Sequence, residues 1–378
     1  MTTTVTTTPE PTRRILCSSV DFGFGSAGKM LSILEHLGDC RLTVVGSELL
    51  SSITSTPAAA AHAGAAVSWG PELEWIEKGE IRVEDYDAAL VILDPDLATE
   101  LTERGLPVVY VDSLPHIWGP ADPICTEVFA YCAQATTQEQ QRFEALDDVR
   151  TLDWVEPIIS VREPGERDHE LAVVNVGGVH SPHLVGGTSP YVATVVLPTV
   201  RALLAAGRMV RVAGNVGGAV AEQLAELGVA SGVMARPDFL SLVASAGLLV
   251  TSPGMTAMLE AGAARTPTIL LPPQNLSQIL NADALAGEVV SRRIDWPDQW
   301  LSRAAVEEAR LLGEEAALEV IYDGIECIAD LPEAPEWVLV QVAQRLAEAD
   351  FWLSERVAGV GTGGARRVAT HVRRAAAA

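Results

Sequence analysis

Residues 248–284 read LLVTSPGMTAMLEAGAARTPTILLPPQNLSQILNADA and carry the clearest fold signal in the chain. An apolar run at 248–251 has the length of a buried strand, and the Ser-Pro-Gly segment at 252–254 is a turn. A helical pattern follows at 255–264, and a second buried strand is expected at 268–271. Strand, turn, helix and strand in this order predict a parallel βαβ unit.

The turn and helix of this unit are suited to a phosphate, because the first N–H groups of a helix have no helical partner. Glu260 lies deeper in the same helix, where a carboxylate can accept two sugar hydroxyls. The candidate donor-binding residues of the stretch are Ser252, Gly254, Met255, Thr256, Glu260, Gln274, Asn275 and Gln278. Taken alone, such a stretch is more often an ordinary βαβ unit with a capped helix and a solvated loop, so the rest of the chain must decide.

The 378-residue chain is long enough for two α/β domains. Strand patterns alternate with helix patterns throughout, which predicts mostly parallel sheets with right-handed crossovers. A charged segment containing Pro and Gly at 157–170 is the expected linker. We expect a disordered tail at 1–12, domains at 13–160 and 161–335, a long C-terminal helix at 336–357 and a flexible tail at 358–378. The crevice between two doubly wound halves is the natural ligand site.

Composition and charge narrow the functional classes. No apolar run approaches a membrane span, the N-terminus lacks a hydrophobic signal core, and the five scattered cysteines indicate free thiols, so we expect a cytoplasmic protein. The net charge of −24 argues against nucleic acid and against a membrane-bound lipid acceptor. An anionic substrate would need a local basic pocket, which makes Lys29, one of only two lysines, informative.

A glycine-rich turn joins the first expected strand to its helix. Gly23, Gly25 and Gly28 form G-x-G-x-x-G, and Glu48 lies 20 residues further on. This spacing matches a dinucleotide-binding fingerprint and keeps an NAD(P)-dependent oxidoreductase as an alternative. The charged Lys29 at the helix start weakens that interpretation. The other interpretation is a tight loop that lets a second substrate approach the backbone, with Lys29 at its positive end.

Catalytic candidates lie at two strand mouths of the first half. Asp21 precedes the glycine turn and can accept a proton from a nucleophile, or cap the following helix. Asp112 and His116 follow another strand and can act as base and orienter, with Trp118 beside them as a stacking surface. A lone His in a loop is more often simply solvated, so Asp21 is the preferred base.

The second half offers further candidates for binding a diphosphate. Gly177 and Gly178 follow its first strand and allow close approach to the backbone, and His180 can donate to a phosphate oxygen. Arg236, just before a helix, can recognise a nucleobase or an acidic sugar group, with a surface arginine as the alternative. No spacing of Cys, His and acidic residues suits a metal site, so we expect neither a metal nor another cofactor.

The motifs T-S-P-G-M-T-x-x-x-E-A-G, P-T-I-L-L-P and Q-N-x-x-Q-x-x-N-A at 251–282 resemble the donor-binding half of GT-B glycosyltransferases, especially glycosyltransferase family 28. The resemblance implies that the turn and helix hold the diphosphate of a UDP-sugar, that Glu260 binds the ribose and that the Gln-rich loop reads the sugar. It also implies an acceptor-binding first domain, a nucleotide-sugar-binding second domain and a C-terminal helix that packs back onto the first. The first glycine loop lacks the His usual in such relatives, which favours Asp21 as the base.

The string DFGFGSAGK at 21–29 is similar to one in cytosylglucuronate synthases. This resemblance implies transfer of glucuronic acid from UDP-glucuronate to cytosine or hydroxymethylcytosine in nucleoside antibiotic biosynthesis. The acceptor-side residues would be Phe22, Gly23, Phe24, Gly25, Ser26, Lys29, Asp112 and Trp118. Lys29, Arg236 or His180 would meet the glucuronate carboxylate. A UDP-sugar 2-epimerase of the same architecture and a nucleotide-binding module without catalysis stay as alternatives, and a homodimer is left open.

Overall fold

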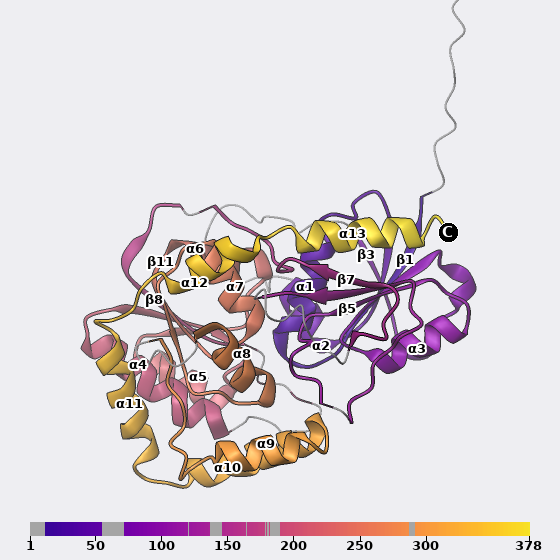
Figure 1. Cartoon of the computed structure of the whole chain (residues 1–378). Helices are drawn as coiled ribbons and strands as arrows, with labels where there is room; N and C mark the ends of the chain where they lie inside the picture. Colours follow the sequence, from indigo (N-terminus) through magenta and orange to yellow (C-terminus); the bar gives the residue numbers. More distant parts are fainter. Residues whose placement is uncertain are drawn as a thin grey trace, which may run out of the picture.

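The computed structural model describes residues 12–54, 72–119, 121–136, 146–163, 165–177, 179, 181, 190–286 and 292–378. They form two α/β domains that lie side by side (Figure 1). Residues 1–11 of the expected N-terminal tail fall outside the described residues, as do two predicted site residues, Gly178 and His180.

The first domain is built on a seven-stranded parallel sheet with the order β3-β2-β1-β4-β5-β6-β7. Its strands are β1 (Arg14–Ser19), β2 (Arg41–Val45), β3 (Leu73–Ile76), β4 (Ala88–Ile92), β5 (Val108–Asp112), β6 (Ala130–Gln134) and β7 (Leu152–Val155). Its helices are α1 (Gly23–Leu34), α2 (Glu48–Thr54) and α3 (Pro95–Glu103), with short 3-10 turns η2 (Lys78–Glu80) and η3 (Val83–Asp85). All five residues of β4 are buried, as expected for a parallel strand covered on both faces.

The second domain has a five-stranded parallel sheet with the order β10-β9-β8-β11-β12. The strands are β8 (Asp168–Gly177), β9 (Met209–Gly214), β10 (Ala230–Gly232), β11 (Ala246–Thr251) and β12 (Thr268–Leu270). The helices are α4 (Leu197–Ala205), which continues the π-helical η6 (Val192–Val196), then α5 (Gly218–Glu226), α6 (Arg236–Ser245), α7 (Met255–Ala263), α8 (Leu276–Ala286), α9 (Arg303–Arg310), α10 (Glu314–Ala329) and α11 (Ala334–Arg345).

Both sheets confirm the predicted doubly wound α/β fold. In each sheet the strand order reverses once, between β1 and β4 in the first domain and between β8 and β11 in the second. Connections leave such a switch point in opposite directions, which opens a crevice at the carboxyl ends of the strands. Helix α1 of one domain packs against α7 of the other, which brings the two switch points together at the boundary between the domains.

The C-terminal region differs from the sequence-based expectation. The single helix expected at 336–357 is two helices, α11 and α12 (Trp352–Val360), and α12 packs on α7 of the second domain. The expected flexible tail at 358–378 instead contains α13 (Gly364–Ala375), which lies along the first domain (Figure 1). Helix α13, rather than residues 336–357, therefore packs back onto the first domain.

The composition of α13 explains why the sequence pattern predicts a flexible tail here. Its small apolar residues recur at helical spacing and join the core of the first domain: Ala365, Val368, Ala369, Val372 and Ala375. The arginines point outward. Arg373 donates from Nη2 to Asp39 Oδ1 at 2.7 Å and from Nε to Asp39 Oδ2 at 2.9 Å. The glycine before this stripe is required by packing, because a β-carbon at Gly364 would lie 1.9 Å from the Glu156 carbonyl oxygen. A stretch that reads as low complexity is thus a narrow amphipathic helix.

Candidate active site

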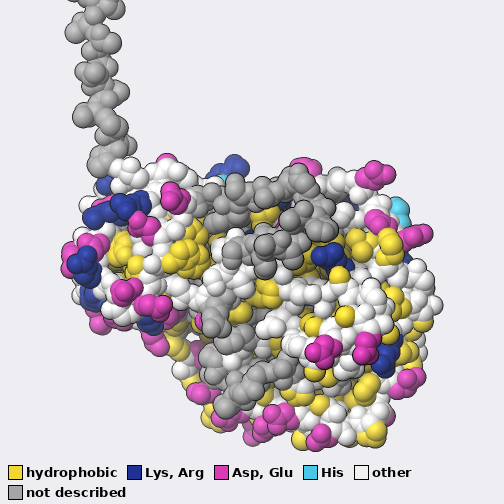
Figure 2. All heavy atoms as spheres, turned by 180° about the vertical axis from the view of Figure 1, so that it is seen from behind, with side chains coloured by type: hydrophobic (Ala, Val, Ile, Leu, Met, Phe, Trp, Pro, Cys, Tyr) yellow, Lys and Arg dark blue, Asp and Glu magenta, His cyan; other side chains and the backbone are white. Residues whose placement is uncertain are grey.

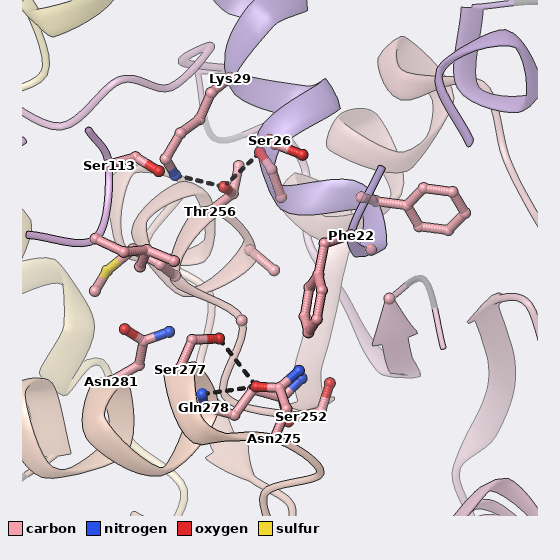
Figure 3. A pocket seen from close by; sticks show the side chains of 18 of the residues that line it. Phe22, Ser26, Lys29, Ser113, Ser252, Thr256, Asn275, Ser277, Gln278 and Asn281 are labelled. Atoms are coloured by element: carbon pink, nitrogen blue, oxygen red, sulfur yellow. Dashed lines mark hydrogen bonds between the residues drawn. The ribbon is translucent and has the colours of Figure 1, made fainter. Parts of the chain in front are cut away.

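A cavity of about 220 Å³ lies between the two domains. Its walls come from the carboxyl ends of the central strands of both sheets: Val20 and Phe22 after β1, Asn175 to Gly177 at the end of β8, and Ser252 after β11. Figure 3 shows Lys29 on one side of this space and the start of α8 on the other. The cavity therefore occupies both switch points, where open α/β sheets bind their ligands.

The N-terminus of α7 faces this cavity. Gly254 is its N-cap, and the first helical hydrogen bond runs from Met258 N–H to Gly254 O at 3.0 Å. The N–H groups of Met255, Thr256 and Ala257 precede that bond, so the helix offers them no partner. All three residues line the cavity. This end of α7 combines free N–H donors with the positive end of the helix dipole, which suits a phosphate.

The end of β8 brings backbone close to the same space. Gly177 has a φ of +65° and donates its N–H to Asn175 Oδ1 at 3.1 Å. Asn175 Nδ2 also donates to Thr251 Oγ1 at 2.9 Å, which ties β8 to β11. Gly214 packs so closely that a β-carbon there would stand 2.6 Å from Gly177 O. A ligand can thus approach the main chain at Gly177 without meeting a side chain.

The glycine-rich segment of the first domain is mostly helix rather than loop. α1 begins at Gly23, whose φ is +60°, so the expected loop at 21–29 ends there. At Gly28, a β-carbon would stand 2.7 Å from Arg236 Nη1 of the second domain. In the dinucleotide fingerprint, the third glycine allows a helix to approach its own strand. Here Gly28 instead allows the two domains to approach each other.

Lys29 crosses from the first domain to the second. Its side chain is buried, and Nζ donates to Thr256 Oγ1 at 2.6 Å, at the start of α7 (Figure 3). Burial lowers the pKa of Lys29 to about 7. The Glu260 carboxylate opposes this shift, and the Arg236 guanidinium adds to it. Lys29 is therefore close to its titration point at neutral pH.

Arg236 and Glu260 form a buried ion pair beside Lys29. Arg236 Nη2 donates to Glu260 Oε1 and, across the domain boundary, to Ser32 Oγ at 2.8 Å. Arg236 Nε is buried and has no hydrogen-bond partner among the described residues. Burial raises the pKa of Glu260, while the Arg236 guanidinium opposes that rise. Two basic side chains, Lys29 and Arg236, thus lie beside Glu260 in a chain of net charge −24.

Asp112 holds the aromatic wall of the cavity in place. It is fully buried at the end of β5, and its oxygens accept from Tyr131 Oη at 2.7 Å, Trp118 Nε1 at 2.9 Å and Leu114 N at 3.0 Å. Burial raises the pKa of Asp112 to about 6, although these donors favour the ionised form. Trp118 lines the cavity and Asp112 does not. Asp112 therefore acts on the site through the Trp118 ring.

His116 is an interdomain contact. Asn281 Nδ2 donates to Pro253 O at 3.1 Å, so Asn281 Oδ1 faces His116 and accepts from its Nε2 at 3.0 Å. Burial lowers the pKa of His116 to about 4, so the ring is neutral at pH 7. It joins the first domain to α8 and is not part of the cavity wall.

Most of the predicted residues meet at one place. Those that line the cavity are Phe22, Gly23, Phe24, Gly25, Ser26, Lys29, Trp118, Gly177, Arg236, Ser252, Gly254, Met255, Thr256, Glu260, Asn275 and Gln278. Four described residues are not in its wall: Asp21, Asp112, His116 and Gln274. Asp21 lies between two wall residues, and the Gln274 amide donates to Val176 O at 3.2 Å and so supports the wall from behind.

Sequence reasoning missed Glu314, which lines the cavity at the start of α10. Burial and the nearby Asp122 carboxylate raise the pKa of Glu314 to about 7. Asp122 accepts from the N–H of Glu314 at 3.1 Å and from that of Gly119 at 2.7 Å, which joins the domains. No motif surrounds Glu314. The available sequence signal was Gly313, because glycine can adopt the φ of +118° that the chain has between α9 and α10.

Several solved structures share this arrangement of domains. Arabidopsis thaliana UGT89C1 complexed with UDP has a TM-score of 0.53 at 12% identity, over 96% of this chain and 100% of that chain. The same enzyme complexed with quercetin gives 0.53 at 11%, over 97% and 100%. CalG4, the calicheamicin glycosyltransferase, gives 0.50 at 17%, over 97% and 98%. The fold is that of the GT-B glycosyltransferases.

The sequence also places the chain in a family. The model of the CGA synthase-related protein family matches residues 41–325, and the chain belongs to that family. No curated relative matches the sequence significantly. Among the described residues, no cluster of three or more His, Cys, Asp or Glu could hold a metal ion. None of the described helices has the length and apolar character needed to cross a membrane.

Proposed function

We propose that the protein transfers a sugar from a UDP-sugar to a small, soluble acceptor. The observation that carries this proposal is the N-terminus of α7, whose free N–H groups at 255–257 open onto a cavity shared by both GT-B domains. A diphosphate bound there would face the acceptor domain across the cavity. The fold and the family both agree with this activity.

In this proposal the second domain holds the donor. The diphosphate binds at the N-terminus of α7 and at the Gly177 backbone, and Glu260 accepts hydrogen bonds from the ribose. Asn275 and Gln278, which line the cavity near the start of α8, face the sugar. The acceptor attacks the anomeric carbon, the bond from that carbon to the β-phosphate oxygen breaks, and UDP leaves. Helix N–H groups and cationic side chains stabilise the negative charge on the departing UDP in place of a metal ion. EDTA should therefore not reduce turnover.

We further propose glucuronic acid as the sugar and cytosine or hydroxymethylcytosine as the acceptor. The family description agrees with cytosylglucuronic acid (CGA), and the string at 21–29 resembles enzymes that make it. The basic side chains Lys29 and Arg236, both of which line the cavity, suit a strongly anionic donor such as UDP-glucuronate. Phe22, Phe24 and Trp118 give the cavity an aromatic wall on which a planar base can stack. The base nitrogen that attacks the sugar releases its proton to a carboxylate.

The donor class is tested by thermal shift with UDP, UDP-glucuronate, UDP-glucose and NAD. We expect stabilisation by UDP and by UDP-glucuronate, and none by NAD. Stabilisation by NAD alone would overturn the proposal. UDP release is then measured with and without cytosine. Binding of UDP without turnover of cytosine or hydroxymethylcytosine would remove the acceptor assignment, and a sugar epimer formed without acceptor would favour an epimerase.

A further inference from the structure

Lys29 is an unusual cation for a buried position. Its Nζ can donate three hydrogen bonds, and the one it makes to a described residue is with the neutral Thr256 hydroxyl. The nearby carboxylate, Glu260, is already paired with Arg236. Burying an ammonium group is costly unless an anion compensates it. The remaining donors of Lys29 therefore lack an anionic partner within the described part of the chain.

The position of Lys29 indicates what that partner is. Lys29 lines the cavity, and its Nζ lies 2.6 Å from a side chain at the second position of α7. The free N–H groups of Met255, Thr256 and Ala257 begin at the same place. Figure 3 shows the Lys29 side chain reaching down from α1 to Thr256 on the other domain. An anion bound at the start of α7 would thus meet helix N–H groups on one side and the Lys29 ammonium on the other.

We propose that Lys29 of the acceptor domain binds the diphosphate of the donor and stabilises the negative charge on UDP as it leaves. This inference rests on the proposed function, and it moves Lys29 from the acceptor to the leaving group. Charge on the β-phosphate oxygen grows as its bond to the anomeric carbon breaks, so a cation fixed beside it stabilises the transition state more than the bound donor. Since Lys29 belongs to the other domain, donor binding and domain contact are coupled through this side chain.

Proton uptake on binding is a consequence that can be measured. Burial lowers the pKa of Lys29 to about 7; the Glu260 carboxylate opposes this shift and the Arg236 guanidinium adds to it. Glu35 in turn raises the pKa of Glu260. A bound diphosphate raises the pKa of Lys29 further, so the neutral fraction takes up a proton when UDP binds. The affinity for UDP should then fall as the pH rises above about 7. Without the lysine, this part of the pH dependence disappears.

The first experiment compares the wild type with Lys29→Met by calorimetric titration with UDP from about pH 6 to about pH 9. Comparing the two proteins cancels the titration of UDP itself. Methionine fills a similar volume without charge, and Lys78→Met, at an exposed lysine paired with Asp94, is the matched control. We expect Lys29→Met to weaken UDP binding by at least about tenfold and to lower the turnover rate by about a hundredfold, while Lys78→Met changes neither.

The outcomes separate the two levels of the proposal. If the wild type does not bind UDP at all, the proposed function fails. If the wild type binds UDP and Lys29→Met binds it equally well, with the same pH dependence, the function stands and the role of Lys29 is wrong. Unchanged circular dichroism and a cooperative unfolding transition without UDP establish that the variant is folded.

A second measurement needs no substitution at Lys29. The chain contains only two lysines, so protein with isotope-labelled lysine gives two side-chain NMR signals, and Lys78→Arg assigns them. The Lys29 signal should titrate near pH 7 without ligand, and its midpoint should rise clearly when UDP is saturating. A midpoint that UDP does not move would overturn the proposal.

Discussion

Gly28 of the first domain and Arg236 of the second are in direct contact across the cleft. A β-carbon at position 28 would stand 2.7 Å from Arg236 Nη1, closer than a carbon and a nitrogen can approach without displacement. The end of an arginine side chain can usually move away. Here it is buried and bonded to both Glu260 and Ser32, so movement breaks those bonds. The contact therefore fixes how closely the domains approach.

Gly28→Ala should lower stability even though alanine favours a helix. Overpacking costs about 1–3 kcal/mol, which outweighs the gain of about 1 kcal/mol from replacing a helical glycine. Gly25→Ala is the matched control, because its β-carbon would lie 3.8 Å from Thr256 Oγ1 and make an ordinary contact. Urea unfolding of both variants checks this, and equal stabilities would contradict the proposed domain contact.

Removing Glu260 should be costly in two ways. Glu260→Ala leaves Arg236 buried without its carboxylate, which costs about 3–5 kcal/mol of stability, and it removes the proposed ribose ligand. The double variant Arg236→Met/Glu260→Leu should recover most of the stability because no buried charge is left unpaired. It should not recover UDP binding. Unfolding curves and UDP titrations on the same samples separate the two effects, and recovery of both would show that Glu260 does not contact the donor.

The fold could be predicted because the signals for it are local. Buried strands, turns and helix patterns such as 248–271 each depend on a short stretch, and together they gave two doubly wound domains. Many residues of the candidate site could be predicted for the same reason, since ligands of open α/β sheets bind where strands end. Residues such as Phe22, Ser252 and Thr256 follow strands and do line the cavity.

What could not be predicted depends on contacts between distant segments. Glu314 reaches the cavity only because α10 begins beside Asp122 of the other domain, some 190 residues away in sequence. Lys29 and Gly28 looked like parts of a loop that binds ligand, yet their partners Thr256 and Arg236 lie on the other domain. Helix α13 has a stripe of alanine and valine too weak to identify until the core it covers is known.

Helix α13 should be necessary for the stability of the first domain. Val368 is fully buried in the core of that domain, so Val368→Ala should cost about 1–3 kcal/mol, and Val368→Asp should cost more because it buries an unpaired charge. Thr370→Ala on the exposed face of the same helix is the control and should have little effect. Melting temperatures by circular dichroism check this. A loose tail would make all three variants equivalent to the wild type.

Glu314 should make the protein less stable as the pH rises from mildly acidic to neutral. Its pKa is about 7 in the folded chain against an ordinary value of 4.5, so the folded chain holds the proton more tightly than the unfolded chain. The folding stability that this difference in pKa provides is fully present below about pH 4.5 and is lost as the pH rises through about 7. Asp112 and Glu260, whose pKa values burial also raises, act in the same direction. The difference in melting temperature between Glu314→Gln and the wild type should therefore change over this range, and a constant difference would contradict the raised pKa.

Among the described residues, Glu314 and Asp21 are the two candidate carboxylates for taking the proton from an attacking nucleobase. Glu260 also lines the cavity but is paired with Arg236, whereas Glu314 lines it beside the Asp122 carboxylate. Asp21 lies next to the wall and is the choice that the sequence favours. Asp21→Asn and Glu314→Gln keep size and polarity and remove only the acid–base function, so UDP binding should survive in both.

The variant that lacks the catalytic carboxylate should lose turnover by about 10²–10⁴-fold, while the other variant keeps most of its turnover. If Glu314 is the base, the wild-type rate at saturating substrate should rise with pH through about 7, because only the ionised carboxylate can accept the proton. Glu314→Gln should then have a low, flat profile. A steep loss in Asp21→Asn with an unchanged pH profile in Glu314→Gln would instead assign the proton transfer to Asp21 and leave Glu314 as a contact between the domains.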